Sequence, residues 1–345
     1  MTRRVSKLEM ISQSGTASEN DVADLTHMTA PWAHRNRFLV LGRAGLDLYA
    51  DPPGSRVEDA ARFTSALGGS AANIAVAIAR LGGVASLISA VSDDAVGRYT
   101  VNQLKHYGVG TGDVRAAGGE FRNSLAVVET RAENCQSVIY RNGAADFQIS
   151  EDQVHAAAIK DFGALIVTGT ALAADPSRSA ALLAMTIARE SGVRVILDID
   201  YRPYSWASAA DAARTCTRAA ALSDIVIGND TEFAVMAGPG GDGLALARRT
   251  GNAVYKMGER GSIAFAGGLA IETGIYRVTA LKPTGAGDAF MGGYVTGLAQ
   301  GFDLKTCILR GTAAAAIVVT RVGCAPAMPS EAELQDFMAS HPGPA

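Results

Sequence analysis

The stretch KPTGAGDAFMGG at residues 282–293 joins a glycine-rich turn directly to an apolar segment of helical composition. A helix start presents unpaired backbone N–H groups and the positive end of the helix dipole, so it stabilises an anion without a cationic side chain. Glycine lets this backbone approach the anion closely. The stretch therefore predicts an anion-binding turn at Gly285, Ala286 and Gly287, opening a helix over 286–299.

Asp288 follows this turn, although a carboxylate beside a bound anion is repelled by it. Phosphoryl transfer explains the arrangement, because a carboxylate can take the proton of an attacking hydroxyl while N–H groups neutralise the transferred group. We therefore predict Asp288 as a catalytic base, with Gly285, Ala286 and Gly287 as its anion hole. The alternative, which the motif taken alone favours, is that Asp288 only caps the helix.

Short apolar runs alternate with Ala-rich segments of helical spacing from residue 37 onward. This alternation predicts an α/β fold whose mainly parallel sheet is covered by helices on both faces. The expected strands are 38–41, 85–91, 164–168, 194–198, 225–228 and 253–256. The expected helices are 71–81, 96–107, 177–191, 207–222, 286–299 and 304–319. Gly82, Gly192 and Gly301 stand where three of these helices should stop.

Two segments interrupt that rhythm with the alternating pattern of antiparallel strands. We expect them to form a small β lid, from about 46–64 and 121–142, on a single catalytic domain of residues 36–330. Residues 1–35 contain no apolar block of the kind that a secretory signal needs, and we expect a disordered extension there. Residues 331–345 are expected to be a C-terminal tail.

The composition limits the possible partners. The 345 residues are 48% hydrophobic and 19% charged, with a formal net charge of -3, so no basic excess is present to bind nucleic acid. No apolar run reaches the roughly 20 residues that span a membrane. The cysteines are scattered, without the spacing of a zinc site or a disulfide framework. We therefore expect reduced thiols and a cytoplasmic protein that binds neither nucleic acid nor membrane.

A second glycine pair precedes a helix in LGGSAANIAVAIARLG, residues 67–82. Gly68 and Gly69 would admit a polyol against bare backbone, and Asn73 can both donate and accept hydrogen bonds with sugar hydroxyls. The alternative is a tight turn with a capping Asn, since a glycine-rich string alone is weakly specific.

Together the two glycine motifs resemble the signature motifs of the ribokinase family of carbohydrate kinases, in the expected order. Three other segments are similar to that family: GRAGLD at 42–47, the N-x-x-E element NDTE at 229–232, and the glycine loop KMGERG at 256–261. The resemblance covers residues 37–329. It implies a three-layer α/β/α sandwich with a β lid, and ATP and Mg²⁺ as cofactors.

The resemblance also implies a role for each matching residue. The sugar-binding residues would be Asp47, Gly68, Gly69 and Asn73. The ATP-binding residues would be Asn229, Lys256, Gly258, Gly261, Thr284, Gly285 and Gly287. Asn229 and Glu232 would hold magnesium, which prefers oxygen ligands. The alternative for this pair is a helix start, with Asn229 as the cap and Glu232 completing a capping box.

Two arginines indicate an acidic sugar. Arg202 lies in DIDYRPYSW, residues 198–206, directly after an expected strand and at the edge where open α/β sheets bind ligands. Its guanidinium can pair bidentately with a carboxylate, and the segment resembles the family members that phosphorylate keto-deoxy sugar acids. Arg141 in the lid is predicted as a second anion contact. Either arginine alone would more commonly form a surface salt bridge.

Lys282 and Pro283 stand where the broad family usually has Asp-Thr. In many relatives that Asp serves a monovalent-cation site. We hypothesise that the Lys282 ammonium supplies the positive charge instead.

Several alternatives stay open at this point. The keto-deoxy sugar acid is not fixed, and 2-keto-3-deoxygluconate is one candidate. A catalytically silent sugar-acid binding protein would keep the same scaffold. A dinucleotide-dependent dehydrogenase is disfavoured, because no G-x-G-x-x-G follows the first strand. The resemblance further implies a possible homodimer that pairs through the lid.

Overall fold

The computed structural model describes residues 34–131 and 134–344. The prediction of a disordered extension at 1–35 therefore falls almost wholly outside the described residues. None of the described helices is long and apolar enough to cross a membrane. The thiols of Cys135, Cys216, Cys307 and Cys324 are free, as the sequence predicts.

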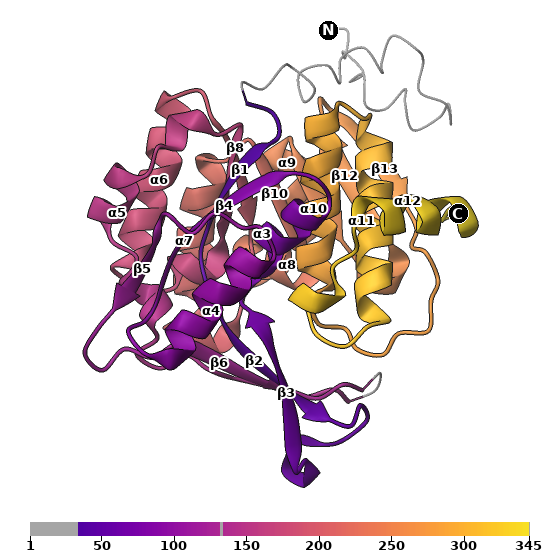
Figure 1. Ribbon diagram of the computed structural model, residues 1–345. Coiled ribbons are helices and arrows are strands. Elements are labelled where there is room, and N and C mark those ends of the chain that lie inside the picture. Colours follow the sequence, from indigo (N-terminus) through magenta and orange to yellow (C-terminus); the bar gives the residue numbers. More distant parts are fainter. Residues whose placement is uncertain (1–33, 132–133, 345) are drawn as a thin grey trace, which may run out of the picture.

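The main sheet is mostly parallel (Figure 1). Within the described residues its strand order is β13-β12-β11-β10-β9-β8-β1-β4-β5. The bounds are β1 Arg37–Leu41, β4 Val84–Ser92, β5 Val114–Ala117, β8 Ala164–Thr168, β9 Arg194–Asp198, β10 Ile225–Asn229, β11 Ala253–Lys256, β12 Ser262–Ala266 and β13 Leu269–Thr273. Among the described strands of this sheet, the antiparallel pairs are β11 with β12 and β12 with β13, and β12 and β13 form a hairpin at one edge. All six predicted strands are present, and the α/β prediction is confirmed.

Helices cover both faces of this sheet, as expected for strands that are apolar on both sides. On β1, Phe38 and Val40 face one core, while Leu39 and Leu41 face the other. The first core is covered by α3 Ser70–Arg80, α4 Ala95–His106, α10 Ala286–Gln300, α11 Leu304–Val319 and α12 Glu331–Ser340. The second is covered by α5 Glu151–Ala156, α6 Ser177–Glu190, α7 Ala209–Ala221, α8 Asp230–Ala237 and α9 Gly243–Thr250. The three-layer prediction is therefore confirmed.

A second, smaller sheet projects from one end of the main body (Figure 1). Its strand order is β3-β2-β6-β7. The bounds are β2 Gly45–Asp51, β3 Arg62–Gly68, β6 Ser124–Val128 and β7 Ser137–Tyr140. β2, β6 and β7 correspond to the two segments predicted as a lid, whereas β3 continues four residues beyond the predicted end of the first segment at residue 64. The sheet buries Tyr49, Ala66, Ala126 and Val128 against Cys324 of the main body, which lies in the segment that follows α11.

Helices α3 and α10 approach each other closely because Gly292 has no side chain. A Cβ on Gly292 would lie 2.4 Å from the Cβ of Ala77 and 3.1 Å from its carbonyl carbon. This contact lies one turn after Asn73 on α3 and one turn after Asp288 on α10. The packing therefore helps to fix the relative positions of two predicted site residues.

Replacing Gly292 with Ala should lower the free energy of unfolding by about 1–3 kcal/mol, the cost of overpacking a dense core. Alanine favours a helix by up to about 1 kcal/mol, but the 2.4 Å contact outweighs that gain. Urea unfolding would measure the change. Gly112→Ala is the matched control, because nothing lies within 4 Å of a Cβ at Gly112. Equal stability of the two variants would contradict the packing argument.

Candidate active site

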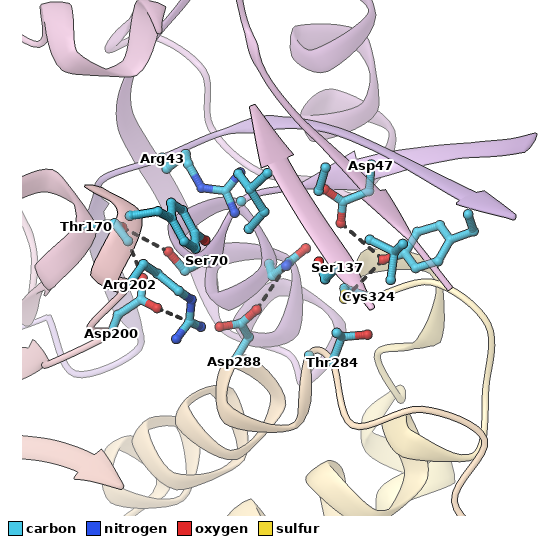
Figure 2. Close-up of a pocket in the computed structure, with 18 residues that line it drawn as sticks. Arg43, Asp47, Ser70, Ser137, Thr170, Asp200, Arg202, Thr284, Asp288 and Cys324 are labelled. Atoms are coloured by element: carbon cyan, nitrogen blue, oxygen red, sulfur yellow. Dashed lines mark hydrogen bonds and ion pairs between the residues drawn. The ribbon is translucent and has the colours of Figure 1, made fainter. Parts of the chain in front are cut away.

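A cavity of about 280 Å³ lies where the lid sheet meets the carboxyl ends of the central strands (Figure 2). Its walls include Asp47 from β2 and Asn73 from the first turn of α3. Arg202, from the loop after β9, and Asp288, from the start of α10, complete the opposite side. The two glycine motifs, which are more than half the chain apart, therefore meet at one cavity.

Asp288 points into this cavity and does not cap its helix. The N-cap of α10 is Gly285, at φ 85°, which has no side chain to bond the free N–H groups there. The Asp288 carboxylate instead accepts a hydrogen bond from the Asn73 amide, with Nδ2 and Oδ2 2.9 Å apart. The capping alternative for Asp288 is therefore not supported by the structure.

Its surroundings prepare the Asp288 carboxyl to accept a proton. Burial raises its pKa to about 7, with a smaller contribution from the neighbouring Asp200 carboxylate. The hydrogen bond from Asn73 and the charges of Arg202 and Lys256 act in the opposite direction. A carboxyl with a pKa near neutrality suits general base catalysis at physiological pH.

Asp200 is a site residue that the sequence analysis did not assign. It lies buried two residues after β9, with a positive φ of 37° that is uncommon outside glycine. Its Oδ2 accepts a hydrogen bond from Thr170 Oγ1 at 3.0 Å, and its Oδ1 lies 2.9 Å from Arg202 Nη2. The sequence could have indicated Asp200 as a site residue, because it follows the end of a strand, which is the reason that Arg202 was predicted.

Arg202 lines the cavity as predicted, but its guanidinium is already paired. Besides Asp200, its Nη1 lies 3.8 Å from Glu232 Oε1 and donates to the Tyr201 carbonyl at 3.1 Å. Figure 2 shows the Arg202 side chain directed toward Asp288. Arg202 thus balances a group of carboxylates at this end of the cavity.

A second hollow of about 240 Å³ lies on the other side of the glycine turn. Its walls include Asn229, Lys256, Gly258, Gly261, Ala286 and Gly287. Gly285 and Asp288 line the first cavity, so the turn separates and faces both spaces. Asn229, Lys256, Gly258, Gly261 and Gly287, which were predicted to bind nucleotide, therefore lie together, whereas Thr284 and Gly285 of the same prediction line the first cavity.

Asn229 and Glu232 form the capping box that was considered as their alternative role. The Asn229 side chain accepts from Glu232 N at 2.9 Å, and Glu232 Oε2 accepts from Asn229 N at 2.7 Å. In the part of the chain that the structure describes, no three His, Cys, Asp or Glu groups converge to hold a metal ion. A metal at this place would therefore need ligands from a bound molecule.

Asp47 and Asn73 are oriented for a ligand. Asp47 Oδ2 accepts from the Tyr49 hydroxyl at 3.0 Å. Among the described residues, neither Asp47 Oδ1 nor Asn73 Oδ1 has a hydrogen-bond partner, although both are buried. Unpaired buried oxygens are costly, so these two atoms indicate positions where a polar ligand binds.

The glycine pair serves the cavity in two ways. Gly69 lines it. A Cβ on Gly68 would lie 1.9 Å from Asp47 Oδ1, so the bare backbone of Gly68 makes room for that carboxylate. Gly68 therefore lies beside Asp47 and does not itself line the cavity.

Arg141 is not among the residues that line the cavity, contrary to its predicted role as a direct anion contact. It is buried and pairs with Asp146, with Nε and Oδ2 3.0 Å apart, and it donates to the Thr170 carbonyl at 2.8 Å. Its guanidinium also lies 4.0 Å from the centre of the Phe147 ring. Arg141 therefore supports Thr170, which does line the cavity.

The chain is similar to known proteins. Residues 35–331 match the model of the pfkB family carbohydrate kinases. A protein named 5-dehydro-2-deoxygluconokinase, from Photobacterium profundum, is 43% identical over 310 residues, covering 87% of this chain and 94% of that protein. One named 5-dehydro-2-deoxygluconokinase 1, from Bacillus cereus, is 36% identical over 312 residues, with the same coverage.

The fold also matches solved structures. A fructokinase double mutant from Vibrio cholerae O395, determined with fructose, ADP and a potassium ion bound, superposes with a TM-score of 0.80. It is 25% identical, and the match covers 89% of this chain and 99% of that one.

The free energy of unfolding of the wild type should fall relative to that of the Asp288→Asn variant as the pH rises toward 7. The unfolded carboxyl ionises near its ordinary pKa of 3.8, whereas the folded one does so near 7. Between these values the folded wild type keeps a proton that the unfolded chain has lost, so its stability falls by up to about 1.4 kcal/mol per pH unit. Above pH 7 the loss levels off. Urea unfolding from pH 5 to 8 would measure it, and a pH-independent difference would contradict the raised pKa.

Proposed function

We propose that this chain, which belongs to the pfkB family of carbohydrate kinases, transfers the γ-phosphoryl group of ATP to the terminal hydroxyl of 5-dehydro-2-deoxygluconate. The product would be the 6-phosphate, and the reaction would belong to myo-inositol catabolism in the cytoplasm. The observation that carries the proposal is the glycine turn that faces two cavities, with Asp288 on one side. The names of the relatives support the choice of sugar acid.

The first cavity would hold the sugar acid and the second would hold ATP. Asp288 accepts the proton of the substrate's terminal hydroxyl while the oxygen of that hydroxyl forms a bond to the γ-phosphorus of ATP. The bond from that phosphorus to the bridging oxygen breaks, which releases ADP. The N–H groups of Gly285, Ala286 and Gly287 stabilise the charge on the transferred group. Asn73 holds the Asp288 carboxylate in position through its 2.9 Å hydrogen bond.

The binding residues are assigned by the same division. Asp47, Gly69 and Asn73 would bind sugar hydroxyls, and Asp47 Oδ1 and Asn73 Oδ1 are the unpaired acceptors that support this. ATP would contact the backbone of Gly258, Gly261 and Gly287 and the ammonium of Lys256. The Asn229 side chain, which also lines the second cavity, would complete this nucleotide set, whereas Thr284 lines the first cavity and falls on the sugar side.

Magnesium fits this site as a partner of the ATP phosphates. Asp198, Asp200, Glu232 and Asp288 interact electrostatically with one another and with two cations, Lys256 and Arg202. The carboxylates outnumber the cations, which favours a divalent cation. Glu232 Oε1 and the Asn229 side chain would contact its hydration shell, since magnesium keeps several waters and needs few protein ligands. When bound, it would neutralise phosphate charge.

Pairing of two copies through the lid is part of the proposal. Phe63 on β3 and Val138 and Tyr140 on β7 are exposed apolar side chains on the lid strands. These strands are the two edges of the lid sheet, and exposed apolar side chains on one sheet favour an interface.

Steady-state phosphorylation with ATP and MgCl₂ tests the function. The highest kcat/KM is expected with 5-dehydro-2-deoxygluconate, compared with 2-keto-3-deoxygluconate, ribose and fructose. Asp288→Asn is the matched control and should lower kcat by roughly 10²- to 10⁴-fold, with the KM for ATP unchanged. Preference for 2-keto-3-deoxygluconate would replace the substrate and keep the mechanism. Use of neutral sugars alone would refute the sugar-acid assignment, and binding without turnover would favour the silent binding protein.

The position of Lys282 supports the proposal that this kinase needs no monovalent cation. Its side chain is fully buried, and its ammonium donates to the Thr284 carbonyl at 2.5 Å and to the Val318 carbonyl at 3.4 Å. Backbone carbonyls are the ligands that a potassium ion would use. We therefore propose that Lys282 fixes the residue before the glycine turn by its own charge.

The wild type is therefore expected to turn over at the same rate in potassium chloride and in tetramethylammonium chloride at matched ionic strength. Lys282→Met should lower kcat in both salts, because the ammonium that holds Thr284 is lost. Initial rates across a salt series would measure this. Strong activation of the wild type by potassium would exclude the role given to Lys282.

A further inference from the structure

Two guanidinium groups line the sugar cavity, and they enter from different walls. Arg202 comes from the loop after β9, and Arg43 comes from the connection between β1 and β2. Figure 2 shows Arg43 on the opposite side of the cavity from Asp288. From sequence, Arg202 is the residue expected to bind the carboxylate of an acidic sugar, and Arg43 has no predicted role. The structure separates the two residues by position and by partners.

Arg202 lies at the reacting end of the cavity. It pairs with Asp200 at 2.9 Å and is near Glu232 at 3.8 Å. Asp288 adds to the negative charge around it, and the side chain is directed toward that residue. An extended six-carbon acid separates its carboxylate from its terminal hydroxyl by roughly 6 Å, given C–C bonds of about 1.5 Å. A sugar acid with its hydroxyl at Asp288 therefore carries its carboxylate away from Arg202.

Arg43 has the opposite properties. Among the residues that the structure describes, it makes no ion pair, and its guanidinium donates one hydrogen bond, from Nη1 to Ser124 Oγ at 3.2 Å. Its backbone is fixed, because its carbonyl accepts from Ala72 N at 3.2 Å in the first turn of α3. A Cβ on Gly45 would lie 3.3 Å from Nη1, so the glycine leaves room for the guanidinium. Arg43 is thus positioned but not neutralised.

The electrostatic surroundings agree with this placement. Burial raises the pKa of Asp47, and Arg43 is the first cation that opposes the shift. Arg43 therefore lies on the lid side of the cavity, near the carboxylate proposed to bind sugar hydroxyls. Tyr204 also lines the cavity; burial raises its pKa, and the charges of Arg43 and Arg202 oppose that shift.

We propose that Arg43, and not Arg202, binds the carboxylate of the sugar acid and so determines the preference for acidic over neutral substrates. This inference rests on the proposed function. It assigns the two cations different tasks. Arg43 pairs with the substrate, and Arg202 balances the carboxylates around the catalytic base.

The test compares 5-dehydro-2-deoxygluconate with the neutral analogue in which a hydroxymethyl group replaces its carboxylate. Arg43→Gln should raise KM for the acid roughly 10- to 100-fold, the loss expected for a charge-assisted hydrogen bond, and leave KM for the analogue nearly unchanged. Arg43→Lys keeps the charge and should lose less. Arg202→Gln should instead lower kcat for both substrates.

Arg62→Gln is the matched control, since Arg62 lies exposed on the lid strand β3 and does not line the cavity. It should leave both KM values unchanged, and thermal unfolding would confirm that each variant is folded. If Arg202→Gln, and not Arg43→Gln, raised KM for the acid alone, the assignment to Arg43 would be overturned while the function stood. If the wild type preferred the neutral analogue, the sugar-acid function would fail, and the Arg43 assignment with it.

Discussion

The start of helix α10 is the constraint on which the site depends. Residues 289–299 of this helix are buried, so its position is set by contacts with α3 and α11 rather than by solvent. Gly285 precedes it at φ 85°, and a Cβ there would lie 2.9 Å from Cys324 Sγ. Only glycine suits both conditions. The turn therefore has one arrangement, and its two sides face the two cavities.

The buried site also holds several carboxyl groups, and burial makes their ionised forms less stable. Nearby cations partly offset this effect. Burial raises the pKa values of Asp198, Glu232 and Asp288, because each carboxylate is less favourable as an anion there. Lys256 and Arg202 counter this without cancelling it. A cation bound beside these groups would stabilise their ionised forms, and a kinase binds such a cation together with its nucleotide. The strain at Asp200, with its positive φ, is tolerated because Thr170 and Arg202 hold the carboxylate.

Sequence patterns identified those elements whose signal is local. β8, β9 and β11 were predicted to the residue, since each is a short apolar run. The β12–β13 hairpin was missed, although Gly267 and Gly268 mark its turn with positive φ. Asp288 and Asn73 were found through the glycines beside them, whereas the capping box of Asn229 and Glu232 stayed ambiguous. The contacts of Arg141 and Arg43 could not be predicted, because each depends on segments distant along the chain.

Separate positions for Arg202 and Arg43 help to keep the catalytic base, Asp288, ionised. Arg202 lowers the pKa of Asp288, and it also faces Asp200 and Glu232. A substrate carboxylate bound to Arg202 would add another negative charge beside these groups. Through-space repulsion would then raise the pKa of Asp288 further and lower the fraction of it that is ionised near neutral pH. Binding that carboxylate at Arg43 keeps the substrate charge on the lid side of the cavity. Selection of an acid and activation of its distant hydroxyl can then proceed without opposing each other.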